Sequence, residues 1–164
     1  MKHLKKIPLV IISIITISAS CKKNTDPDPN SFYFQCKING QTYIPGLGNG
    51  LTCEILADTT LLLGGNIGFE SVDIGIIKLD KISITVTTYI LNNNLQQNGF
   101  YDNSPLVNDI YKTDSTRTGE LNITTLDKAN KIISGTFYFK AYNSYRNDSV
   151  SVTDGKFRLH YIIS

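Results

Sequence analysis

The sequence of 164 residues is short of the side chains on which catalytic and metal sites are usually built. It contains two histidines, His3 near the start and His160 near the end, and three widely spaced cysteines. It has no CxxC pair to bind zinc and no GxSxG motif to present a nucleophilic serine. A hydrolase needs a nucleophile next to a base, so we expect no catalytic residue. We also expect no metal and no cofactor, and a protein that is not an enzyme.

An excess of one charge is also missing. The chain has 16 basic and 14 acidic residues, and three of its lysines, Lys2, Lys5 and Lys6, stand at the start. Without residues 1–20 the count is 13 basic against 14 acidic, a net charge of −1. A nearly neutral chain without a Lys/Arg cluster gives no electrostatic reason to expect nucleic acid as a partner.

The sequence has a single long apolar run, Ile7–Ile17, which follows the basic start and precedes a small-residue run that ends at Cys21. The run is too short to remain as a membrane-spanning helix, so residues 1–20 are predicted to be a secretory signal peptide. The segment resembles a bacterial lipoprotein box, although Ser18 stands where leucine is usual. This resemblance implies cleavage before Cys21, lipidation of its thiol and attachment to the outer membrane, on the periplasmic or the outer face. Ordinary secretion and an uncleaved anchor are the alternatives.

Residues 22–31 read KKNTDPDPNS, a polar, proline-interrupted stretch with nothing apolar to bury. Together with Cys21 this stretch is predicted to be a flexible tether, followed by one domain over residues 32–164. Cys36 and Cys53 remain as a pair in an oxidising compartment, so we expect a disulfide between them. The alternative is a pair of free thiols buried in the same core.

From Phe32 onward the apolar residues recur with the period of two that is typical of strands. Asn39-Gly40 predicts a hairpin, and strands are expected over residues 51–57, 61–67, 72–79 and 82–90. Residues 92–118 are rich in Asn, Asp, Gly and Ser, so we expect a long loop there, with a short strand at most around 109–112. No segment has a sustained helical period.

The last third has the clearest alternation. Residues 133–142 and 150–159 alternate apolar and polar side chains, and Asp154-Gly155 predicts a final two-residue hairpin. That register sends six side chains to the core, Phe137, Phe139, Val150, Val152, Phe157 and Leu159. It sends Tyr138, Lys140, Tyr142, Ser151, Arg158 and His160 to solvent. The fold class is therefore all-β, with about nine antiparallel strands in a β-sandwich or a strongly curled, partly open barrel.

Three segments carry a family resemblance. They are CKING at Cys36–Gly40 followed by Tyr43 and Pro45, IISGTFYF at Ile132–Phe139, and VSVTDGKF at Val150–Phe157. In this order they resemble a group of small Bacteroidota lipoproteins classed as a domain of unknown function. The resemblance supports the envelope location and the β fold, and it implies no activity.

Several side chains could serve recognition at the surface. Tyr138, Lys140 and Tyr142 form an outward stripe, while Tyr101 and Tyr111 flank the Asn/Asp-rich loop. Exposed aromatic rings beside polar groups suit sugar rings, although tyrosine is also an ordinary strand residue. Three Asp-Ser/Thr triplets resemble acceptors of Bacteroidota O-glycosylation, with Thr59, Ser115 and Ser149 as the modified positions.

The sequence thus favours a non-enzymatic lipoprotein of the cell envelope. Its β-domain is expected to bind a ligand or partner at the outer membrane, such as a glycan or an envelope protein. The alternative is a calycin-like carrier whose sheet closes around a small apolar molecule, and an enzyme ranks third.

Overall fold

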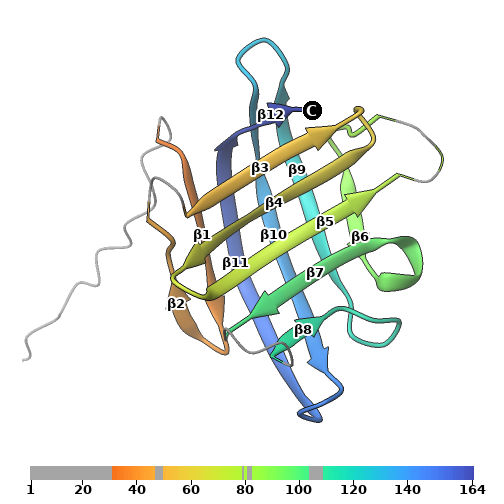
Figure 1. The fold of residues 1–164 in the computed structure, drawn as a ribbon. Coiled ribbons are helices and arrows are strands. Elements are labelled where there is room, and N and C mark those ends of the chain that lie inside the picture. Colours follow the sequence, from red (N-terminus) through yellow and green to blue (C-terminus); the bar gives the residue numbers. More distant parts are fainter. Residues whose placement is uncertain (1–30, 47–49, 79, 81–82, 104–108) are drawn as a thin grey trace, which may run out of the picture.

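Figure 1 shows the fold in a computed structural model, which describes residues 31–46, 50–78, 80, 83–103 and 109–164. The predicted signal peptide, Cys21 and all of the tether except Ser31 lie outside the described residues. Within the described part of the chain the one helix is a 3₁₀ turn, η1 (Asn93–Leu95), and no helix is long and apolar enough to cross a membrane.

The described chain is otherwise built of strands, which confirms the all-β prediction. They are β1 (Tyr33–Ile38), β2 (Gln41–Tyr43), β3 (Leu51–Leu56), β4 (Thr60–Ile67), β5 (Glu70–Ile77), β6 (Thr88–Leu91), β7 (Gln97–Asp102), β8 (Ile110–Lys112), β9 (Gly119–Asp127), β10 (Ile132–Asn143), β11 (Asp148–His160) and β12 (Ile162–Ile163).

The strands form one open sheet that folds over on itself into two layers. Its order is β12-β3-β4-β5-β7-β8-β10-β11-β1-β2, and β9 pairs with both β10 and β6. In Figure 1 the layer of β3, β4, β5 and β7 crosses in front of the layer of β9, β10, β11 and β1. All pairs are antiparallel except β12 with β3, which is parallel.

Strand β10 turns the sheet from one layer into the other. Along residues 132–139 it pairs with β9, and at Tyr142 it pairs with Lys112 of β8 instead. Strand β8 in turn pairs with β7 of the front layer. The short strand β8 therefore forms the corner between the two layers.

The first predicted hairpin is confirmed. Ile38 pairs with Gln41, so Asn39 and Gly40 form a two-residue turn, with φ values of 49° and 82°. Both φ values are positive, as in the two-residue hairpin turn whose backbone twist matches the twist of the flanking strands. Asparagine and glycine adopt positive φ values most readily.

The second predicted hairpin is wrong. Asp154 and Gly155 lie inside one continuous strand, β11, which pairs with β10 on one side and β1 on the other. The pairing shifts by one residue at this point: Phe137 is opposite Gly155, whereas Phe139 is opposite Val152. Asp154, with φ 53°, is the extra residue of a β-bulge.

The predicted directions of the side chains are nevertheless correct. A bulge adds one residue to the strand, so Val152 and Phe157 return to the same face, just as they would across a two-residue turn. All six predicted core residues are buried, and Tyr138, Lys140, Ser151 and His160 are exposed. Tyr142 and Arg158 are half-buried on the outer face.

Two further predictions need correction. The predicted loop over 92–118 contains β7, which pairs with β5 on one side and β8 on the other. Gly99 and Tyr101 of this polar segment face inward. The predicted strand over 82–90 shrinks to β6, and Ile82 lies outside the described residues. In β6 the buried side chains are Tyr89 and Leu91, whereas Ile90 is exposed.

The centre of the core is a group of phenylalanines between the layers. The Phe137 ring lies 5.0 Å from that of Phe34, 6.5 Å from that of Phe139 and 6.4 Å from that of Phe157, measured between centroids. Some of these rings pack directly against the backbone of glycines in neighbouring or facing strands. A Cβ atom on Gly99 would lie 2.6 Å from the Phe139 ring. On Gly155 it would lie 2.6 Å from the Phe137 ring.

Truncation of Phe157 tests the facing of β11. Its side chain is fully buried, so Phe157→Ala should lower the free energy of unfolding by about 3 to 5 kcal/mol. His160 is exposed, and its ring lies edge to face with that of Phe32 at a centroid distance of 6.2 Å, so His160→Ala should cost less than about 0.5 kcal/mol. Urea unfolding of both variants decides the matter, and equal losses would show that the facing is misassigned.

A pair of glycine substitutions tests the ring-on-backbone packing. In Gly99→Ala the new methyl group would overlap the Phe139 ring, so we expect a loss of about 1 to 3 kcal/mol. Gly75 of β5 is the control, because a Cβ there would lie 3.5 Å from Leu62 and 3.9 Å from Phe100, which are ordinary contacts. Gly75→Ala should change the stability by less than about 1 kcal/mol. A Gly99→Ala protein as stable as the Gly75→Ala protein would contradict this packing.

Candidate functional surface

The structure separates the four tyrosines predicted to bind a ligand into two pairs. Tyr101 in β7 and Tyr111 in β8 are buried, with exposed fractions of 7% and 6%, so the prediction that they flank a loop as exposed rings is wrong. Their ring centroids lie 5.7 Å apart inside the fold. Tyr138 and Tyr142 both lie on the outer face of β10, as predicted.

Tyr101 belongs to a hydrogen-bonded cluster with Tyr43 and Glu70. The Tyr101 hydroxyl donates to Glu70 Oε1 at 2.7 Å, and the Tyr43 hydroxyl lies 2.9 Å from the carbonyl oxygens of both Gly65 and Glu70. Burial, with the nearby Glu70 carboxylate as a further cause, raises the pKa of both hydroxyls above the usual tyrosine range. Both hydroxyls therefore stay protonated at neutral pH, and the cluster ties β2 to the β4–β5 turn.

The outer pair belongs to the tyrosine stripe, defined as Tyr138, Lys140 and Tyr142. The side chains point outward because alternate residues of β10 fill the core. Tyr138 is 49% exposed, and it lies opposite Glu120 of β9. Partial desolvation and the charge of Glu120 raise the pKa of the Tyr138 hydroxyl. The stripe presents an accessible aromatic ring, an exposed ammonium group and a half-buried ring along one strand.

The stripe ends at a cation held over an aromatic ring. The guanidinium carbon of Arg117 lies 3.7 Å from the centroid of the Tyr142 ring. Asp114 forms a salt bridge with Arg117 and also accepts hydrogen bonds from the backbone N–H groups of Thr116 and Arg117, each at 2.8 Å. Desolvation opposes its ionisation, but these hydrogen bonds lower the pKa of Asp114 to about 2. The Asp114 carboxylate is therefore charged at neutral pH, as its salt bridge with Arg117 requires.

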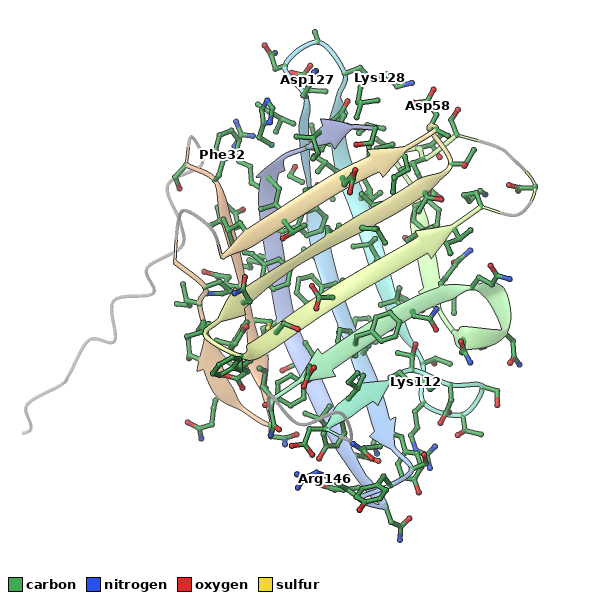
Figure 2. The ribbon with its side chains drawn as sticks, viewed as in Figure 1. Phe32, Asp58, Lys112, Asp127, Lys128 and Arg146 are labelled. Carbon is green, nitrogen blue, oxygen red and sulfur yellow. The ribbon has the colours of Figure 1, made fainter. Side chains whose placement is uncertain are left out.

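Side chains of the two layers meet on the outside at β8. Phe100 of β7 is opposite Lys112 of β8, and Lys112 is opposite Tyr142 of β10. Directly opposed residues of antiparallel strands point to the same face, so the three side chains form one row across the corner. We call Phe100, Lys112, Tyr142, Arg117 and Lys140 the β8 corner. Figure 2 shows Lys112 at the lower end of the molecule, together with Arg146.

The β10–β11 turn next to this corner is fixed by an ion pair. Arg146 pairs with Asp109, whose side chain is buried beside the start of β8. The hydrogen bond and charge of Asp109 raise the pKa of Arg146 above its usual value. The side-chain oxygen of Asn143 accepts hydrogen bonds from the backbone N–H groups of Tyr145 and Arg146, both at 2.9 Å. These contacts hold β8 against the end of β10.

The two cysteines do not form the predicted disulfide. Cys36 in β1 and Cys53 in β3 are free and buried, and their strands are not neighbours in the sheet. Burial raises the pKa of both thiols to about 12, and at Cys36 the charge of Glu70 adds to the effect. The thiols stay protonated, so they are core side chains without nucleophilic character, as the alternative interpretation of the sequence had it.

The remaining sequence candidates are dispersed. Thr59 is half-buried in the β3–β4 turn, Ser115 is exposed near Arg117, and Ser149 is half-buried in β11. His160 lies on the outer face of β11, far along the strand from the stripe. Within the described residues no group of three His, Cys, Asp or Glu side chains could hold a metal ion.

Sequence reasoning identified the stripe but missed Arg117, Lys112 and Phe100. The alternation of β10 was visible in the sequence, whereas the partners come from the segment interpreted as a loop. One local signal was present: Asp114 followed three residues later by Arg117 is the spacing of a tight turn closed by its own side chain.

Comparison with known proteins gives a family and no neighbour of known activity. No curated protein and no solved structure matches the chain. A family model described as a domain of unknown function (DUF6252) matches residues 30–159. The match includes all of β1 to β10, and within β11 it omits only the last residue, His160. It includes the whole tyrosine stripe. Because the model covers most of the 164 residues, the chain belongs to the DUF6252 family, a domain of unknown function.

Proposed function

We propose that this protein is a non-enzymatic lipoprotein of the cell envelope, anchored to the outer membrane through Cys21, whose β-domain binds a glycan or an envelope protein. The support for the anchor is the sequence of the first 21 residues. The support for binding is the tyrosine stripe with Arg117 fixed beside it. O-glycosylation at Thr59, Ser115 and Ser149 remains a further proposal, and Ser115 is the most exposed of the three.

The stripe carries the binding proposal because its parts are accessible and already ordered. Tyr138 offers an exposed ring, and such rings stack on the apolar face of a sugar while neighbouring polar groups bond its hydroxyls. Arg117 is held by Asp114 over Tyr142 before any ligand arrives. A pre-ordered surface loses little side-chain entropy on binding, which favours a modest but specific affinity.

A calycin-like carrier is the second candidate, and the core argues against it. Carriage of an apolar molecule requires space between the layers. At the centre of this fold the rings of Phe34, Phe137, Phe139 and Phe157 occupy that space and contact one another. Binding on the outer face is therefore the better supported interpretation.

A substitution at Cys21 tests the proposed attachment to the membrane. Cys21→Ser removes the thiol that the lipoprotein box would acylate, so we expect no labelling with an alkyne palmitate analogue and release from the membrane fraction. Cys36→Ser is the matched control, because its thiol is buried in β1 and should not affect acylation. Undiminished labelling of the Cys21→Ser protein would refute the lipoprotein assignment.

Loss of the exposed ring is the test of binding. On a glycan array the full-length protein in detergent should retain a limited set of sugars. Tyr138→Ala should weaken that retention about tenfold, since a stacked ring contributes about 1 to 2 kcal/mol. Phe69→Ala is the control, because Phe69 is 75% exposed but lies in the β4–β5 turn, away from the stripe. Equal effects of both variants, or no retained sugar, would count against a glycan ligand.

A further inference from the structure

The β8 corner combines two lysines with two aromatic side chains on one outer face. Lys112 projects between Phe100 and Tyr142, and Lys140 lies two residues before Tyr142 on the same face of β10. Neighbouring strands lie about 4.8 Å apart, so the two aromatic side chains are rooted about 10 Å from each other, with the lysine between them. A row of ring, cation and ring is thus built across the junction of the two layers.

Some of the charged side chains at this corner are held in ion pairs, and others could interact with a ligand. Arg117 is paired with Asp114, Arg146 with Asp109, and Glu120 lies against Tyr138 farther along β10. Lys112 and Lys140 are exposed, and among the described residues neither ammonium group has an ion-pair partner. Two carboxylates share the outer face at the Phe100 end of the row: Asp73 of β5 lies opposite Phe100, and Asp102 follows Phe100 by two residues on β7. The Asp73 carboxylate accepts a hydrogen bond from the Ser71 hydroxyl. Lys112 and Lys140 lie toward the Tyr142 end, where the two cations can meet a ligand.

We propose that the β8 corner binds a carboxylate-bearing sugar. Lys112 and Lys140 would pair with the carboxylate, and the aromatic rings of the row would contact the apolar face of the sugar ring. Charge-assisted hydrogen bonds from two ammonium groups give such a site its preference for an acidic over a neutral sugar. This inference rests on the proposed function, since it names the ligand class of the same surface.

The carboxylate is tested by changing the ligand and leaving the protein intact. Tetragalacturonate and its methyl ester have the same sugar rings and differ in charge. In calorimetric titrations of the full-length protein in detergent, the free acid should bind at least about tenfold more tightly than the ester. The advantage should shrink as salt is raised, because exposed ion pairs are screened.

The lysines are tested by a matched pair of double variants. Lys112→Gln with Lys140→Gln should weaken binding of the free acid about tenfold and leave binding of the ester unchanged. Lys128→Gln with Lys131→Gln removes the same charge from the β9–β10 turn, at the opposite end of the molecule in Figure 2, and should change neither affinity. All four lysines are exposed, so both proteins should keep the unfolding midpoint of the parent.

The outcomes separate this inference from the function on which it rests. Equal affinity for acid and ester, or equal losses in the two double variants, overturns the acidic-sugar inference, while a Tyr138-dependent neutral ligand still supports glycan binding. Failure of the acid to bind also overturns it. If, in addition, no glycan of the array depends on Tyr138, the glycan arm of the proposed function fails as well.

Discussion

The contact on which the fold most depends is that between phenylalanine rings and glycine backbone in the centre of the core. Phe139 covers Gly99 of the front layer, Phe157 covers Gly135, and Phe137 covers Gly155. A side chain at any of these glycines would enter a space that a ring already fills. Only the contact of Phe139 with Gly99 joins the two layers, and there the missing side chain of the glycine leaves room for the ring. The other two contacts join the neighbouring strands β10 and β11 within one layer.

The outer surface follows from this inner arrangement. Because alternate residues of β10 are committed to the core, Tyr138, Lys140 and Tyr142 have only the solvent face available. Strand β10 is also the point at which the sheet changes layers, so its outer face meets β8 and the turn of Asp114 and Arg117 at one place. The same strand thus supplies the centre of the core and the surface with the most chemical variety.

The chemistry of the surface differs from that of the interior. The thiols of Cys36 and Cys53 and the hydroxyls of Tyr43 and Tyr101 are shielded, and their pKa values are raised so that they remain neutral. The groups that reach solvent at the β8 corner include the ammonium groups of Lys112 and Lys140 and the partly exposed rings of Phe100 and Tyr142. These are the groups on which the proposed binding rests.

The all-β class, the Asn39-Gly40 turn and the facing of β10 and β11 could be predicted from the sequence, because they depend on alternation between adjacent residues and on local turn chemistry. A hairpin and a bulge at Asp154-Gly155 could not be distinguished in this way, since both return Phe157 to the side of Val152. The continuation of β11 depends on its pairing with β1 on one side and β10 on the other, which are long-range contacts. The same holds for β7, whose polar residues form a strand because Gly99 makes room for Phe139, a contact between residues 40 positions apart that no local pattern records.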